Sequence, residues 1–282
     1  MIDQTFVNEL KVSVLKYRWF TCNCYQFQLP NGKTILMDPF LPSADSDNPN
    51  FSSHYCGFLP EDLGRVDYVL LNHTHGDHIG SLKEVYELYH PRIFCHAAYA
   101  YQLCKDLDIP QRMVFPFENE KTYHFEDFTL ETYTARHAGP DNPRPMSMEH
   151  IDEGTPFEEL NHYGMLFNTN FIITTPNHLR IAFSSGVFDE NEKYVWKVAG
   201  IDILIRQCVV EMLNGNYQKT AKEFMETPAK LLLPLHHEKA YEKIDCSDFR
   251  KNLNQYLSEQ NYIGRYFMPE RGRWHEICFG IA

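Results

Sequence analysis

The sequence has no uninterrupted apolar stretch of the length that a membrane-spanning helix needs, about 20 residues. Residues 1–20 mix acidic and basic residues with apolar ones, so they lack the continuous apolar segment of a secretory signal peptide. We therefore expect a cytoplasmic protein without a membrane span.

The sequence also has few basic residues relative to acidic ones. The 282 residues include 26 Lys and Arg against 38 Asp and Glu, a formal net charge of −12. Proteins that bind nucleic acids present a basic surface to the phosphates. The composition therefore argues against a nucleic-acid partner and favours a small-molecule substrate, and it leaves the oligomeric state open.

The eight cysteines are scattered, and no two of them form a C-x-x-C pair. This spacing argues against a disulfide framework or a cysteine-based zinc module, so we expect reduced thiols. Cys22 and Cys24 fall within a predicted strand at 19–28, on one face of it. Neighbouring positions of one strand seldom make a disulfide or a metal site by themselves, so no function is predicted for this pair.

What is present indicates one compact α/β domain over residues 1–282. Apolar residues make up 43% of the chain and aromatic residues 14%, and no linker divides it. Residues 138–163 are irregular and rich in proline, which is typical of a lid-like insertion beside a site. Strands are predicted at 11–17, 19–28, 33–37, 68–71, 92–95, 112–115, 128–134, 164–174, 179–183, 202–206, 230–233 and 274–279, and helices at 81–90, 97–107, 217–227 and from 247 onward.

The most informative segment is His73-Thr74-His75-Gly76-Asp77-His78, which follows the apolar run at 68–71. Three imidazoles and a carboxylate within six residues are typical of a metal site. His73 and His75, two apart in an extended chain, can share one metal, whereas Asp77 and His78 can face a second. The end of a strand followed by a helix is also where open α/β sheets place their active sites.

Further ligands are expected at the ends of other predicted strands. His137 follows the strand at 128–134, and His236 follows the apolar run at 231–235. Its neighbour His237 points elsewhere in any regular backbone. His236 lies closer to the end of the strand, so it is the better candidate.

These pieces, taken in order, resemble the metallo-β-lactamase fold superfamily. The matching features are Asp38-Pro39 after a strand, the segment 73–78, His137, Ser185-Gly186 after a strand, and Pro234-Leu235-His236. The chain is most similar to the branch of predicted metal-dependent hydrolases that includes ascorbate-6-phosphate lactonase and N-acylphosphatidylethanolamine phospholipase D. The resemblance implies a four-layer αββα sandwich, with two mixed sheets face to face and helices outside.

The same resemblance implies the ligand sets and the catalytic residues. The first metal would be held by His73, His75 and His137, and the second by Asp77, His78 and His236. Asp77 and His236 would also take part in catalysis. Asp38 is expected behind the ligands, accepting an imidazole N–H and so fixing its tautomer.

One position departs from the family pattern. Members of the superfamily usually carry Ser-Gly-Asp after the strand at 179–183, and the aspartate bridges both metals. This chain has Val187 there, followed by Phe188 and Asp189. Either Asp189 substitutes as a metal ligand, or the second site is weakened or empty and Asp189 caps the helix that follows.

The function expected from these features is a metal-dependent hydrolase. Metal-bound hydroxide would attack an ester, lactone or phosphoester of a small, anionic substrate. One or two zinc ions per chain suit the imidazole-rich ligands, and manganese or iron also fit. Arg206, at the end of the strand at 202–206, is the expected anion contact. The alternatives are a mononuclear-iron oxidoreductase of the same fold and a non-catalytic binding protein with a degraded second metal site.

Overall fold

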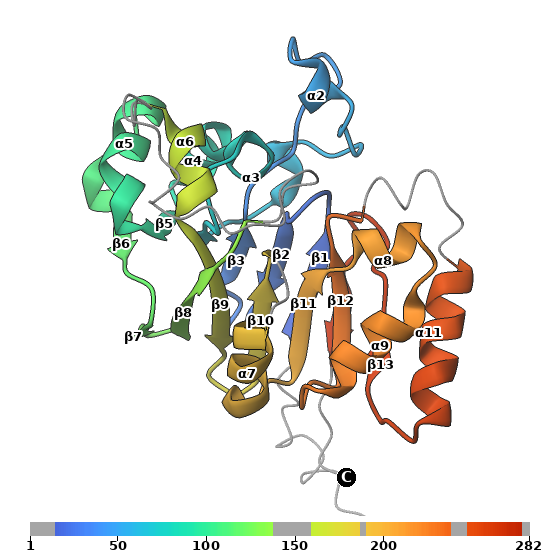
Figure 1. Cartoon of the computed structure of the whole chain (residues 1–282). Coiled ribbons are helices and arrows are strands. Elements are labelled where there is room, and N and C mark those ends of the chain that lie inside the picture. The colour runs from blue at the N-terminus through green and yellow to red at the C-terminus, as the bar shows by residue number, and fades with distance from the viewer. Residues whose placement is uncertain (1–14, 138–158, 187–189, 238–246, 278–282) are drawn as a thin grey trace, which may run out of the picture.

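Two sheets form the centre of the protein, whose computed structural model describes residues 15–137, 159–186, 190–237 and 247–277 (Figure 1). Within these residues each sheet has seven strands, with three antiparallel pairings on one side of the sheet and three parallel pairings on the other. The first sheet has the order β14 (His275–Ile277), β1 (Leu15–Trp19), β2 (Tyr25–Gln28), β3 (Thr34–Met37), β4 (Tyr68–Leu70), β5 (Arg92–His96) and β6 (Val114–Phe117). The second has the order β13 (Arg265–Tyr266), β12 (Leu231–Leu235), β11 (Ile203–Gln207), β10 (Arg180–Ser184), β9 (Asn168–Thr174), β8 (Thr129–Ala135) and β7 (Lys121–His124).

The alternation of side chains along each strand builds the layers, because successive residues point to opposite faces of a sheet. On β3, Ile35 and Met37 belong to the core between the two sheets, and Leu36 belongs to a core on the outer face. On β11, Ile205 is part of the inner core and Leu204 packs outward. Both faces of both sheets are therefore apolar and need cover.

Helices supply that cover on the two outer faces (Figure 1). The outer core of the first sheet includes Leu82 of α4 and Leu103 of α5, and that of the second includes Trp196 of α7 and Phe224 of α9. The helical segments are α2 (Pro49–Ser52), η1 (Pro60–Leu63), α3 (Gly76–Ile79), α4 (Leu82–Tyr89), α5 (Ala97–Leu107), η2 (Gln111–Met113), α6 (Leu160–Leu166), α7 (Glu190–Ala199), α8 (Val209–Leu213), α9 (Tyr217–Met225) and α11 (Ser247–Glu259). The predicted four-layer αββα sandwich is confirmed.

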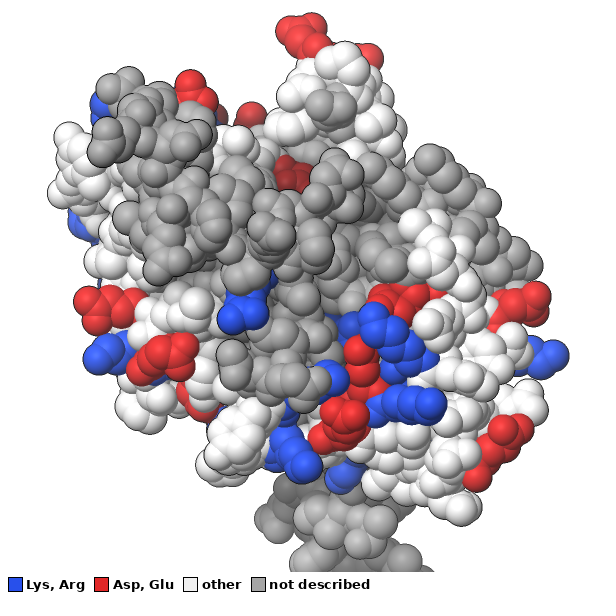
Figure 2. Space-filling view, viewed as in Figure 1, with Lys and Arg blue, Asp and Glu red and all other residues white. Residues whose placement is uncertain are grey.

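The outer surface of the second sheet's helices carries charges of both signs. Figure 2 shows acidic and basic side chains side by side on this face. Lys193 of α7 lies 3.7 Å from Glu226, the residue that follows α9, and Lys219 lies 2.6 Å from Glu211. In the part of the chain that the structure describes, no helix is both long and apolar enough to cross a membrane.

Two local predictions were wrong. The predicted strand 19–28 is interrupted by a turn between β1 and β2, because Phe20 N–H donates to the Cys24 carbonyl at 3.0 Å and Cys22 has a φ of +42°. The predicted strand 164–174 begins only at Asn168, and α6 occupies the residues before it. Of the predicted lid, residues 138–158 lie outside the described residues, and 160–163 form the start of α6.

Candidate metal centre

The side chains expected to bind metal gather at one edge of the sandwich, past the ends of strands from both sheets. β4 runs into His73, and β3, its parallel neighbour, runs into Asp38. From the second sheet, β8 runs into His137 and β12 into His236. Ring-to-ring distances of 5.1 Å between His73 and His137 and 5.5 Å between His78 and His236 show that residues far apart in the chain meet here.

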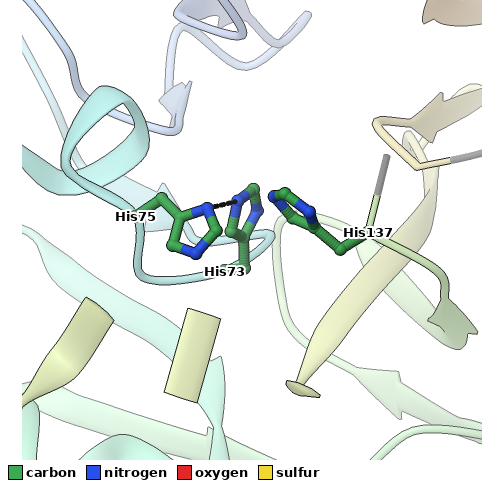
Figure 3. A group of neighbouring side chains, drawn as sticks. All are labelled: His73, His75 and His137. Atoms are coloured by element: carbon green, nitrogen blue, oxygen red, sulfur yellow. Dashed lines mark hydrogen bonds between the residues drawn. The ribbon is translucent and has the colours of Figure 1, made fainter. Parts of the chain in front are cut away.

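Three imidazoles form the first group. One ring nitrogen each of His73, His75 and His137 lies within 4.8 Å of the others, and Figure 3 shows the three rings turned toward one another. His73 Nε2 is 3.2 Å from His75 Nδ1. A set of three histidine ligands with an open fourth position is an established arrangement of catalytic zinc sites. The donor set and its spacing therefore fit a divalent metal ion.

Asn72 fixes the orientation of His73. The Asn72 side-chain oxygen lies 2.5 Å from His73 Nδ1 and also accepts a hydrogen bond of 2.6 Å from the Ser185 hydroxyl. The Asn72 amide nitrogen donates to the Thr169 carbonyl, which identifies the other amide atom as the acceptor. His73 must therefore carry its proton on Nδ1, and this leaves the Nε2 lone pair facing the group. The sequence analysis did not single out Asn72, although it directly precedes the His73–His78 segment.

Helix α6 holds His75 in place from the opposite side. The imidazole is hydrogen bonded to the backbone of Asn161. Gly164 packs so closely that a Cβ at this position would lie 2.6 Å from His75 Cδ2 and 2.9 Å from the His75 backbone nitrogen. Only glycine leaves room for this ring.

Burial keeps the three imidazoles neutral. Removal from water lowers the pKa of His73 well below 6.5, and the neighbouring imidazoles lower it further. The pKa of His75 is lowered to about 4, mainly by burial and next by the charge of His137. The pKa of His137 is lowered for the same first reason. Neutral imidazoles offer the lone pairs that a metal ion requires.

A second group lies beside the first. The Asp77 carboxylate, a ring nitrogen of His236 and the sulfur of Cys22 lie within 4.8 Å of one another. His236 Nε2 is 3.9 Å from Asp77 Oδ2. His78 Nε2 is also 3.9 Å from Asp77, but His78 falls outside the tighter group. Cys22, for which the sequence predicted no function, thus lies in this group in place of the expected His78.

Asp38, predicted to accept an N–H from one of the imidazoles, lies behind His78. His78 Nδ1 is 2.9 Å from Asp38 Oδ2, and the Asn72 backbone N–H donates to Asp38 Oδ1 at 2.7 Å. Both Asp38 and His78 are almost completely buried. Since the carboxylate only accepts, it holds the proton on Nδ1 and turns Nε2 of His78 toward Asp77.

Asp77 is partly open to solvent, with 40% of its side chain exposed. Partial burial raises its pKa, but the imidazoles of His78, His236 and His75 lower it by more, so the net shift is downward. Asp77 is consequently an anion in the range where the imidazoles are neutral.

Two other predicted residues have different outcomes. Asp189, together with Val187, lies outside the described residues. Arg206 lies within them, but its side chain is only 4% exposed and its Nη1 contacts Glu223 of α9 at 2.6 Å. This ion pair engages the guanidinium within the fold, and the role of Arg206 as a substrate contact stays a prediction.

An αββα sandwich with a histidine-rich centre at one edge of its two sheets is the architecture of metallo-hydrolases. The family model of the metallo-β-lactamase superfamily matches residues 17–187. The chain belongs to this superfamily.

Curated proteins that the chain partly matches are named metal-dependent hydrolases. The chain is 37% identical over 67 residues to a UPF0173 metal-dependent hydrolase of Thermodesulfovibrio yellowstonii, a match that covers 24% of this chain and 22% of the relative. A UPF0173 metal-dependent hydrolase of Cupriavidus metallidurans is 29% identical over 104 residues, which cover 37% of this chain and 34% of that protein. The matches thus span between about a fifth and a third of these relatives' length.

Solved structures share the fold over nearly the whole chain. A metallo hydrolase from the archaeon Ignicoccus hospitalis is similar with a TM-score of 0.65 and 13% identity, over 95% of this chain and all of that one. An isothiocyanate hydrolase from Delia radicum gut bacteria has a TM-score of 0.61 and 16% identity, over 93% and 99% of the two chains. At these identities the likeness concerns the fold alone.

Proposed function

We propose that this protein is a metal-dependent hydrolase that cleaves an ester, lactone or phosphoester of a small substrate. The observation that carries the proposal is the convergence of the neutral imidazoles of His73, His75 and His137 beside the anionic Asp77. The name "metal-dependent hydrolase" borne by similar proteins is consistent with it.

The three imidazoles would hold the first metal ion, and Asp77, with His236, a second. A divalent ion at such a site supplies Lewis acidity and lowers the pKa of water. The residues behind the ligands orient the imidazoles before an ion binds. Asn72 and Asp38 hold His73 and His78 in the tautomers whose Nε2 atoms face the centre, so little reorganisation is needed on binding.

The chain's own groups at the open side would act on the reactants. Asp77, ionised and 40% exposed, can accept a hydrogen bond from the attacking water at a carboxylate oxygen and orient it. His236, 18% exposed and 3.9 Å from Asp77, can donate a hydrogen bond to the substrate oxygen on which charge develops. Because Arg206 is bound by Glu223, the proposal extends equally to anionic and neutral substrates.

The test begins with metal content, measured on full-length protein purified without chelator or histidine tag. Bound zinc or manganese, together with hydrolysis of a lactone, ester or phosphodiester that stops on chelation and returns on adding the metal, would support the proposal. The variant His75→Ala should abolish this activity. The matched variant His124→Ala removes an exposed imidazole on β7 and should leave the activity unchanged.

Other outcomes would overturn the proposal. One iron per chain with oxygen consumption would establish the oxidoreductase alternative instead. A protein that binds no divalent metal would fit the non-catalytic alternative, because the imidazole cluster could not support hydrolysis without a bound ion.

A further inference from the structure

Cys22 lies in the turn that separates β1 from β2, where the chain reverses beside the metal centre. The turn is closed by hydrogen bonds from Phe20 N–H to the Cys24 carbonyl at 3.0 Å and from Cys24 N–H to the Thr21 carbonyl at 2.8 Å. The Trp19 indole N–H donates to the Cys22 carbonyl at 3.1 Å. Cys22 is completely buried and forms no disulfide.

This turn is tied to the second sheet at the residue that ends β12. The backbone N–H of His236 donates to the Cys22 carbonyl at 3.3 Å. The side chains meet as well, since the Cys22 sulfur, a His236 ring nitrogen and an Asp77 oxygen lie within 4.8 Å of one another. Three elements of the fold thus bring one sulfur, one nitrogen and one oxygen donor to one point.

The backbone around this point is strained. Cys22, Asp38 and His236 have φ values of +42°, +42° and +48°, in the left-handed region that residues other than glycine seldom adopt. Such residues cost about 1–3 kcal/mol each and cluster at functional sites. Two of the three belong to the group of donors, and the third, Asp38, contacts His78 beside it.

We propose that Cys22 is a metal ligand and completes a second site with Asp77 and His236. The inference deepens the proposed function, on which it rests, by naming the donors of the second ion and the kind of ion that they select. Thiolate ligands favour zinc over manganese, whereas a site of carboxylate and imidazole alone accepts both. The second site is therefore a zinc site in which binding displaces the thiol proton to solvent.

The test uses cobalt(II) as a probe, because a thiolate bound to this ion gives an intense near-ultraviolet charge-transfer band that nitrogen and oxygen ligands do not. Metal-free full-length protein is titrated with cobalt(II) to two equivalents. The band should appear in the wild-type protein as the second site fills. It should be absent from Cys22→Ala, in which the affinity for one of the two ions falls at least tenfold.

The control is Cys24→Ala, the same change two residues away. Cys24 is equally buried, but it packs in the outer core and does not belong to the group of donors. The band should persist in this variant. X-ray absorption of the zinc-loaded wild-type protein needs no substitution and should show a sulfur neighbour at about 2.3 Å.

The failures of the two proposals are distinguishable. Two bound ions with only nitrogen and oxygen neighbours, or a charge-transfer band that survives in Cys22→Ala, would overturn the role of Cys22 and leave the hydrolase proposal standing. Retention of one ion at the three-histidine group with no sulfur contact would do the same. Absence of any bound ion would overturn both.

Discussion

Replacing Gly164 with alanine should weaken the three-histidine site while leaving the fold intact. The added Cβ would lie 2.6 Å from His75 Cδ2, about 0.8 Å closer than the 3.4 Å at which ordinary contact begins. It would also lie 2.9 Å from the His75 backbone nitrogen, which cannot swing aside as the end of a flexible side chain can. Either α6 or His75 must move.

Two effects of opposite sign act on the stability of this variant. Alanine is favoured over glycine within a helix by about 1 kcal/mol, and Gly164 lies within α6. Overpacking at a tight contact destabilises by about 1–3 kcal/mol. The free energy of unfolding should therefore change by no more than about 2 kcal/mol. A ligand displaced by nearly 1 Å, in contrast, should weaken metal binding by about 10–100-fold.

The assay is a competition titration of the metal-free protein against a chromogenic chelator, with thermal unfolding of the same samples. The control is Asn161→Ala, which raises helix propensity in α6 at an exposed side chain and keeps the backbone of Asn161 that bonds to His75. It should bind metal as the wild-type protein does. A Gly164→Ala protein with unchanged metal affinity and a raised melting temperature would refute the reasoning, because helix propensity alone would then account for the change.

Three further predictions concern the groups around the centre. Asp38→Asn, which fits the same left-handed backbone, should weaken binding of the second ion, at Asp77 beside His78, by about 10–100-fold with little change in melting temperature; equal affinity in a chelator competition would contradict this. Burial lowers the pKa of His75 to about 4 from 6.5, so between these pH values the unfolded chain binds more protons than the folded one. Urea unfolding of metal-free protein should therefore show a free energy of unfolding that decreases as the pH is lowered from about 6.5 to 4. Arg206→Ala should destabilise by about 3–5 kcal/mol, since Glu223, with only 12% of its side chain exposed, would lose its partner, and it should change KM equally for anionic and neutral substrates; a selective rise for anionic ones would support the substrate-contact role.

How much of the centre the sequence could predict depends on how far apart its parts lie in the chain. The donors of His73–His78 are local, so their spacing predicts a metal site without any knowledge of the fold. His137 and His236 could be chosen because each follows a predicted strand, and the carboxyl ends of strands that run in the same direction meet at one edge of a sheet. The structure brings both to the expected edge.

The misses have a physical reason in turns and long-range pairs. Cys22 was assigned to a strand because the residues from Trp19 to Gln28 are largely apolar and contain no proline or glycine. The interruption depends on a left-handed cysteine, which residue type does not favour. Arg206 was predicted to contact the substrate because a charge at the end of a strand can have many partners, and that role stays a prediction. In the structure Arg206 pairs with Glu223 of α9, a helix that packs on the outer face of the sheet, and only the folded chain shows that contact.

The metal centre draws its donors from both sheets. Cys22, Asp77 and the histidines of 73–78 come from segments joined to the first sheet, whereas His137 and His236 follow strands of the second. An ion bound here would tie the two halves of the sandwich together in the manner of a crosslink. Because a ligand that binds only the native state stabilises it by mass action, metal loading would report on the docking of sheet against sheet. Loss of the ion should then lower the stability of the core that the two sheets share, far from the edge that holds the metal centre.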